Sequence, residues 1–154
     1  GLYGGAFVYL EGTHSIENTL IMSNDADTLG GGFFVGDNFD DNGVATNVTV
    51  DMTSSVVTDN TADFGGALMV QLGAQLTCSG TSSEVAGVYD NGNTGTSGGG
   101  VVYLYDTAQF LGNSCDMGSG STDNNPADIY SFVAGSNTDY GDDATFNCSG
   151  SGCN

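Results

Sequence analysis

The sequence predicts an all-β fold, a β-solenoid of about five coils that forms a single domain over residues 1–154. The first observation is a Gly-Gly motif that recurs roughly every 30 residues along the chain. The second is the short run of apolar residues after each copy, which is typical of a strand. The third is the composition, because 26 Gly together with many Asn, Ser and Thr favour turns and strands over helices.

The Gly pairs mark the start of one strand in each coil. They are Gly4–Gly5, Gly30–Gly31, Gly65–Gly66 and Gly98–Gly99, and the segments that they open read GGAFVYL, GGGFFVG, GGALMVQ and GGGVVYL. Because glycine has no Cβ, we expect the backbone to bend at these pairs. If the coils stack at about 4.8 Å, equivalent strand residues should form rows. The first such row is Phe7, Phe33, Leu68 and Val101.

An Asn-x-Ala motif precedes most of the Gly pairs. Its copies are NDAD from Asn24, NTAD from Asn60, NTGT from Asn93 and NPAD from Asn125, which place the small residues Ala26, Ala62 and Ala127 two positions later. We expect the small residues to face inward at a tight corner, and the Asn side chains to stack from coil to coil through their amides. NPAD opens a fifth copy, and the segments AQLTC, AQFLG and ATFNC predict a second strand in the last three coils.

Together these motifs resemble a known family of repeats. GGA followed by an apolar residue occurs at Gly4 and Gly65, and Phe-x-x-Asn occurs as FDDN from Phe39 and FLGN from Phe110. This pattern is similar to right-handed parallel β-helix proteins, and most similar to the polymorphic outer-membrane-protein repeats of autotransporter passengers. The resemblance implies a right-handed parallel β-helix. It implies little about function, because the family is defined by its architecture. The complete lack of Lys and Arg in this chain is a departure from the family.

The charge balance excludes several classes of partner. The chain has 19 acidic residues, no Lys or Arg and a formal charge of −19. We expect no nucleic-acid partner, because such a chain repels phosphate groups. We also expect no membrane insertion, because no apolar run approaches the roughly 20 residues of a membrane span. Carboxylate and amide oxygens favour cations, calcium above all, although a self-repelling soluble surface explains the same charge.

Four cysteines, an even number, indicate disulfides and an extracellular or cell-surface location. We favour the pairs Cys78–Cys115 and Cys148–Cys153, with Cys115–Cys148 as the main alternative. The sequons at Asn47 and Asn147 are glycosylation candidates, which this location allows.

Two loops rich in Asp and Asn are calcium candidates. Their ligands would be Asn38, Asp40 and Asn42 in NFDDNG, and Asp139, Asp142 and Asp143 in DYGDD. The first loop approximates the start of an EF-type loop, but Thr49 stands where the twelfth residue should be Glu. Solvated turns have the same composition, so calcium is kept as an alternative.

We expect no enzymatic activity. Pectate-lyase-like and pectinesterase-like β-helices depend on a basic residue in the active site, and this chain has neither Lys nor Arg. The pairs Asp40–Asp41 and Asp142–Asp143 could serve a glycosidase, but adjacent strand residues point to opposite sides. His14 is expected to be a surface side chain.

The leading hypothesis is a structural β-helix outside the cell, which acts as an adhesive scaffold or stacks end to end into a filament. A solenoid exposes unpaired strands at its ends, and the sequence predicts no capping helix. The first motif begins at Gly1 without its Asn, so we expect either further coils before it or an end that meets another molecule. The alternatives are a module that binds calcium or polysaccharide on a strand face with Tyr9, Tyr103 and Tyr105, and a polysaccharide-degrading enzyme.

Overall fold

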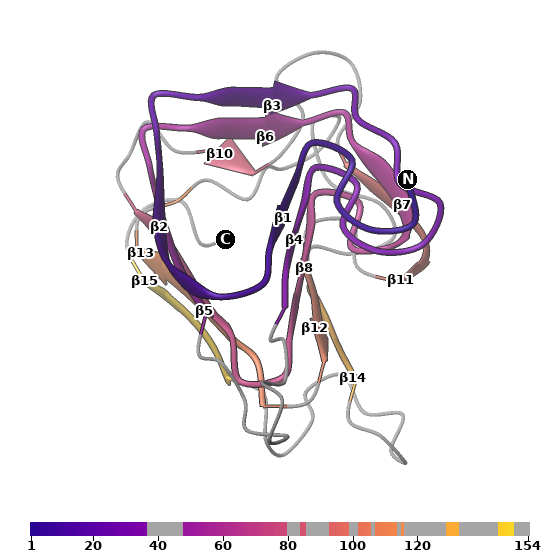
Figure 1. Cartoon of the computed structure of the whole chain (residues 1–154). Helices are drawn as coiled ribbons and strands as arrows, with labels where there is room; N and C mark the ends of the chain where they lie inside the picture. The colour runs from indigo at the N-terminus through magenta and orange to yellow at the C-terminus, as the bar shows by residue number, and fades with distance from the viewer. Residues whose placement is uncertain are drawn as a thin grey trace.

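The computed structural model describes residues 1–36, 48–79, 84–85, 93–98, 102–105, 107–113, 115, 129–132 and 145–149. These residues form strands and turns without any helix, so none of them belongs to a helix that could cross a membrane. The strands lie in four parallel sheets, whose neighbouring strands come from successive turns of the chain (Figure 1). The prediction of an all-β parallel solenoid is confirmed.

Two five-stranded sheets form the long walls. The first has the order β1-β4-β8-β12-β14, with bounds Phe7–Tyr9, Phe33–Val35, Leu68–Gln71, Val102–Tyr105 and Ile129–Phe132. The second has the order β2-β5-β9-β13-β15, with bounds Gly12–Glu17, Val48–Thr53, Gln75–Ser79, Gln109–Asn113 and Thr145–Ser149. Each wall therefore has five layers, in agreement with about five coils.

Two shorter sheets complete each turn. The third wall contains β3 (Leu20–Met22), β6 (Val56–Thr58) and β10 (Glu84–Val85), and a corner sheet pairs β7 (Thr61–Phe64) with β11 (Thr94–Gly98). In Figure 1 the first coil lies nearest the viewer and runs clockwise from β1 through β2 to β3, so the helix is right-handed. This hand agrees with the resemblance given above.

Alternate strand residues fill the interior in rows. The rows of the first wall are Phe33, Leu68 and Val102, and Val35, Val70 and Leu104; the second wall contributes Val50, Leu76 and Phe110. All of these side chains are 0% exposed. Burial of so much apolar surface is the main stabilisation of the fold.

A disulfide joins Cys78 on β9 to Cys115, and both residues are fully buried in this core. The favoured pairing of these two cysteines is confirmed. Because disulfides persist in oxidising surroundings, the bond indicates a compartment other than the reducing cytosol.

The fourth coil is one residue out of step with the alignment of the Gly pairs. Val102, rather than Val101, pairs with Leu68 and enters the buried row. The cause is a register shift in β11 between Gly95 and Gly98, where β11 has one residue more than β7. An extra residue of this kind is a β-bulge, which the motif spacing does not reveal. Gly98 therefore lies one position before the true start of the fourth pair.

The two glycines of each pair have different roles. Gly4, Gly30 and Gly65 have φ angles of 55°, 63° and 65°, in the left-handed region that other residues rarely adopt. Gly5 and Gly31 instead allow close approach, because a Cβ at either position would overlap the carbonyl oxygen of the equivalent glycine in the next coil. The pair thus fixes both the turn and the contact between coils.

The motif asparagines form a one-directional ladder along one corner. The backbone N and Nδ2 of Asn24 donate to Oδ1 of Asn60 at 3.0 and 2.9 Å, and those of Asn60 donate to Oδ1 of Asn93 at 3.1 and 3.0 Å. The Nδ2 groups of Asn60 and Asn93 also donate to a backbone carbonyl of the preceding coil, at 3.1 and 3.0 Å. Both residues are 0% exposed, so the ladder satisfies polar groups that water cannot reach.

Candidate functional site

The first coil presents a free edge made of three strands. Among the described strands, β1, β2 and β3 pair on one side only, with β4, β5 and β6. The outer N–H and C=O groups of these strands are therefore a template for a further parallel strand. This edge faces the viewer in Figure 1.

Exposed hydrophobic side chains concentrate on the same coil. Among the described residues, the large hydrophobic side chains that are exposed are Leu2, Tyr3, Phe7, Val8, Leu10 and Leu20. Phe7 is 41% exposed, whereas Phe33, its partner in the next coil, is 0% exposed. If the edge were covered, Phe7 would bury about 80 Å² more of its surface of about 200 Å². That burial would stabilise the contact by about 2 kcal/mol. The edge is thus apolar as well as unpaired.

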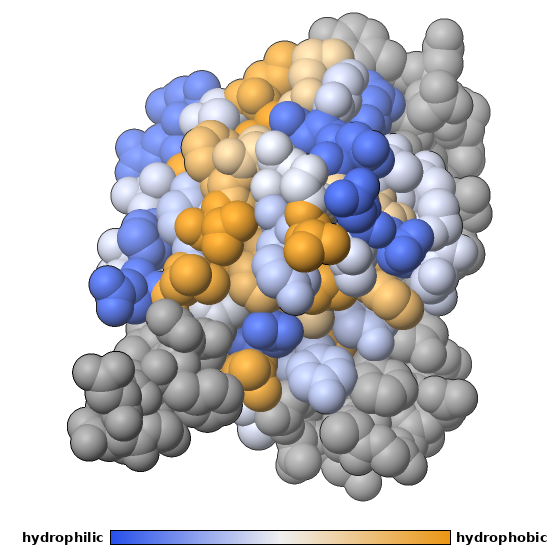
Figure 2. Space-filling model, turned by 45° about the vertical axis from the view of Figure 1, so that its right-hand side comes forward, coloured by the Kyte–Doolittle hydropathy of each residue, from blue (hydrophilic) through white to orange (hydrophobic). Residues whose placement is uncertain are grey.

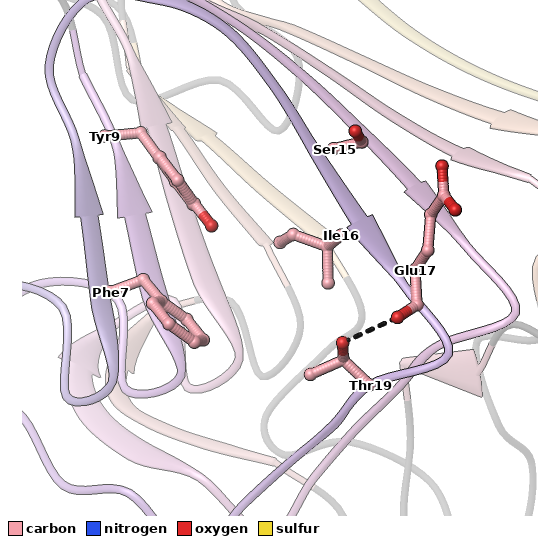
Figure 3. A pocket seen from close by; sticks show the side chains of 6 residues that line it. All are labelled: Phe7, Tyr9, Ser15, Ile16, Glu17 and Thr19. Atoms are coloured by element: carbon pink, nitrogen blue, oxygen red, sulfur yellow. Dashed lines mark hydrogen bonds between the residues drawn. The ribbon is translucent and has the colours of Figure 1, made fainter.

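The interior opens at this edge into a hollow of about 460 Å³ between β1 and β2. It is lined by Phe7, Tyr9, Ser15, Ile16, Glu17 and Thr19 (Figure 3). The hydroxyl of Thr19 donates to the backbone carbonyl of Glu17 at 2.8 Å, which orders the turn after β2. Among the described residues of this lining, Glu17 is the one carboxylate.

Tyr9 and His14 lie where the following coils have apolar core residues. His14 is in register with Val50, so it faces the core and is half-buried, which differs from the expected surface position. Its ring centroid lies 4.5 Å from that of Tyr9, and its Nε2 lies 2.6 Å from the backbone oxygen of Glu11. Burial raises the pKa of Tyr9, so its phenol is neutral and is not a nucleophile near neutral pH.

The asparagine ladder also ends at the first coil. Asn24 donates two hydrogen bonds to Asn60, but its own Oδ1 accepts none from any described residue. The equivalent oxygens of Asn60 and Asn93 each accept two hydrogen bonds, from the backbone and side chain of the preceding Asn. The end of the ladder therefore offers the acceptor that an Asn of another, preceding coil would use.

Acidic side chains surround this edge. Glu11, Glu17, Asp25 and Asp27 are exposed on the first coil, and the chain has no Lys or Arg that could pair with them. Contact with another acidic molecule is therefore opposed by repulsion, which salt screens over about 8 Å at physiological ionic strength.

The structure places only some of the residues singled out from the sequence. Outside the described residues lie Asn38, Asp40, Asn42, Asn47, Gly99, Asn125, Ala127, Asp139, Asp142, Asp143 and Cys153. Asn147 and Cys148 lie on β15, and Ala26 and Ala62 are buried at the ladder corner. In the part of the chain that is described, no three potential metal ligands lie together.

The outer face of the first wall carries a second hydrophobic cluster that the motifs did not predict. Phe34, Met69 and Tyr103 point away from the core, yet they are only 4%, 3% and 7% exposed. A signal was present, because the strands after the Gly pairs are apolar at nearly every position. Continuous apolar runs are typical of strands that are covered on both faces.

Comparison with protein-family models, with curated proteins and with solved structures gives no match to this chain. The edge of the first coil and the outer cluster are therefore the features on which a functional conclusion depends.

Proposed function

We propose that the chain is a non-catalytic structural module, extracellular or at the cell surface, that stacks end to end through its first coil into a filament or scaffold. The observation that carries this proposal is the coincidence of unpaired strands and exposed apolar side chains on one edge. The buried disulfide and the resemblance to autotransporter passenger repeats support a location outside the cytosol.

The partner that fits this edge is the last layer of a second copy. β14 and β15 lie at the opposite ends of the same two five-stranded sheets, so a copy placed head to tail would extend both sheets with parallel strands. In continued register, Ile129 of one copy would pair with Phe7 of the next. Such a contact joins two different surfaces, so it repeats without closure and builds a fibre.

The charge of the chain sets the condition for this assembly. Each copy carries a formal charge of −19, and the acidic side chains around the first coil would approach those of the partner. Added salt should therefore promote stacking, because it screens the repulsion between the acidic copies.

Sedimentation velocity and negative-stain electron microscopy test the proposal on the purified chain, at low salt and at about 0.5 M salt. We expect concentration-dependent filaments that are favoured by salt. Phe7→Asp should abolish them, because it places a charge in the mouth of the core. Thr53→Asp adds the same charge at an exposed position on the side of β5 and should leave assembly intact.

Circular dichroism of both variants must first show an unchanged fold. Monomers at every salt and protein concentration would refute the proposal. Filaments of the Phe7→Asp variant as abundant as those of the unmodified chain would also refute it.

A further inference from the structure

A groove runs along the outer face of the first wall, apart from the stacking edge. It consists of two adjoining hollows of about 280 and 340 Å³, which share Leu29 and Gln71. Tyr3 forms a wall of the first hollow, and Phe64 and Tyr105 form walls of the second. Figure 2 shows hydrophobic side chains gathered on this side of the molecule.

The described lining of the groove is uncharged and rich in aromatic rings. Among the residues that the structure describes, no Asp or Glu lines either hollow. The rings pack in pairs, with centroids 5.4 Å apart for Tyr3 and Phe34 and 4.9 Å apart for Phe64 and Tyr103. Depletion of charge together with aromatic enrichment is typical of the centre of a contact surface.

Gln71 supplies an unused polar group between the two hollows. Its side chain is half-buried and makes no hydrogen bond to any described residue, so its amide can both donate to and accept from a ligand. The amide nitrogen lies over Gly36, 3.2 Å from the place that a Cβ would take, and the ring of Phe34 overlaps that place. Gly36 therefore keeps open the space that this ring and this amide share.

The dimensions of the groove favour a small ligand over a second protein. The floor of the groove is the row of outward-facing residues Val8, Phe34, Met69 and Tyr103. This row crosses the four strands β1, β4, β8 and β12, so the groove is about 15 Å long at 4.8 Å per strand. A stable protein interface buries about 800 Å² on each partner, which would need a strip about 50 Å wide at that length. A four-residue strand provides a width of only about 13 Å. The volumes of the hollows instead lie near those of ligand sites.

We propose that this groove binds a neutral oligosaccharide or polysaccharide that lies along the rod axis. Sugar rings have apolar C–H faces that pack on aromatic side chains, and hydroxyl groups that pair with an amide such as that of Gln71. The charge of −19 disfavours acidic polysaccharides. A cationic ligand would find no carboxylate to neutralise it among the described lining residues.

Calorimetric titration of the full chain tests this with a panel of neutral hexaoses, namely cellohexaose, laminarihexaose, maltohexaose and mannohexaose. The hexamer of galacturonic acid and the hexamer of glucosamine are the anionic and cationic arms. We expect saturable binding of at least one neutral hexaose, tighter than that of its disaccharide because two adjoining hollows are filled. The affinity should change little between low and high salt.

Two variants and one control assign the binding to the groove. Gln71→Met keeps the length of the side chain but removes its amide, and should weaken binding about fivefold, the effect of one hydrogen bond. Tyr3→Ala removes an exposed wall and should weaken binding by a similar factor. Gln109→Met changes an exposed Gln on the other wall and should have no effect.

Absence of binding by every neutral hexaose would overturn the proposal. So would binding that neither Gln71→Met nor Tyr3→Ala weakens, or binding of the glucosamine hexamer alone that disappears in high salt. A lateral dimer that Tyr3→Ala dissociates, without any binding of glycan, would show that the groove is a protein interface.

Discussion

Replacing Asn60 by Ala should remove the middle rung of the asparagine ladder and destabilise the fold by about 4 kcal/mol. The side chain takes part in four hydrogen bonds, because it donates to Ile21 and Asn93 and accepts two from Asn24. Each hydrogen bond between neutral groups contributes about 1 kcal/mol net. Asn60 is 0% exposed, so the groups that lose their partner are not hydrated instead. The loss is a large part of the roughly 5–15 kcal/mol that stabilises a domain.

Equilibrium unfolding in urea, followed by far-ultraviolet circular dichroism, measures this loss. Asn24→Ala is the matched control, because Asn24 ends the ladder, is half-buried and donates only two side-chain hydrogen bonds. It should reduce the free energy of unfolding by about 1–2 kcal/mol. Asn60→Ser replaces the amide by one hydroxyl, which can make some of the hydrogen bonds, so its loss should fall between the other two. Equal losses for Asn60→Ala and Asn24→Ala would refute the view that the ladder holds the coils together.

Three further predictions concern other parts of the fold. Replacing Cys78 and Cys115 together by Ala should lower the free energy of unfolding by about 4 kcal/mol, as expected for a loop of 37 residues, and reduction of the unmodified chain should give the same urea midpoint. Gly31→Ala should destabilise the fold by about 3 kcal/mol, because its Cβ meets backbone of the next coil. Gly73 has a φ of 78°, and a Cβ there makes only an ordinary contact with Oγ1 of Thr107 at 3.6 Å, so Gly73→Ala should lose only about 1 kcal/mol to strain; calorimetric melting of both variants gives the difference. Tyr9 has a raised pKa in the folded state, so the stability that its neutral phenol provides is complete below pH about 10 and is lost as pH rises through the folded pKa. Urea unfolding from pH 9 upward should therefore show an alkaline loss that is smaller in Tyr9→Phe, and identical pH profiles would contradict the assignment.

The stacked architecture was predictable because its contacts repeat with the same chemistry. Three kinds of position in each coil accept few residue types. They are a turn with positive φ, a contact without room for a Cβ, and a buried corner that needs an Asn amide, so the same residues recur there in the sequence. Gly30, Gly31 and Asn60 are thus recognisable from the amino-acid pattern alone. The disulfide Cys78–Cys115 lies where the repeated segments AQLTC and AQFLG form neighbouring strands, β9 and β13.

Other features depend on contacts that the repeat does not record. The bulge before Gly98 shifts the fourth coil by one residue. The spacing of the Gly pairs in the sequence is compatible with both the shifted and the unshifted strand register. His14 faces the core because it is in register with Val50. In the sequence it is a single polar residue among turn-forming residues, a pattern that predicts a surface position. The outer cluster around Met69 is buried only because corner residues such as Phe64 cover it, and such tertiary coverage overrides local pattern.

The geometry of the first wall couples the two proposed activities, stacking and glycan binding. Val8 on β1 continues the row of Phe34 and Met69 to the edge of the first coil, where it is 46% exposed. A coil that pairs with β1 would extend this row, and the first hollow with it, onto the neighbouring copy. A polysaccharide along the row would then contact two copies at once, and the second contact would benefit from a high effective concentration.

A neutral polymer that binds the groove should therefore promote filaments below the protein concentration at which they form alone. Phe7→Asp should abolish this promotion while it leaves binding of a short oligosaccharide unchanged, because Phe7 does not line the groove; equal promotion of the variant would show that the two surfaces act independently.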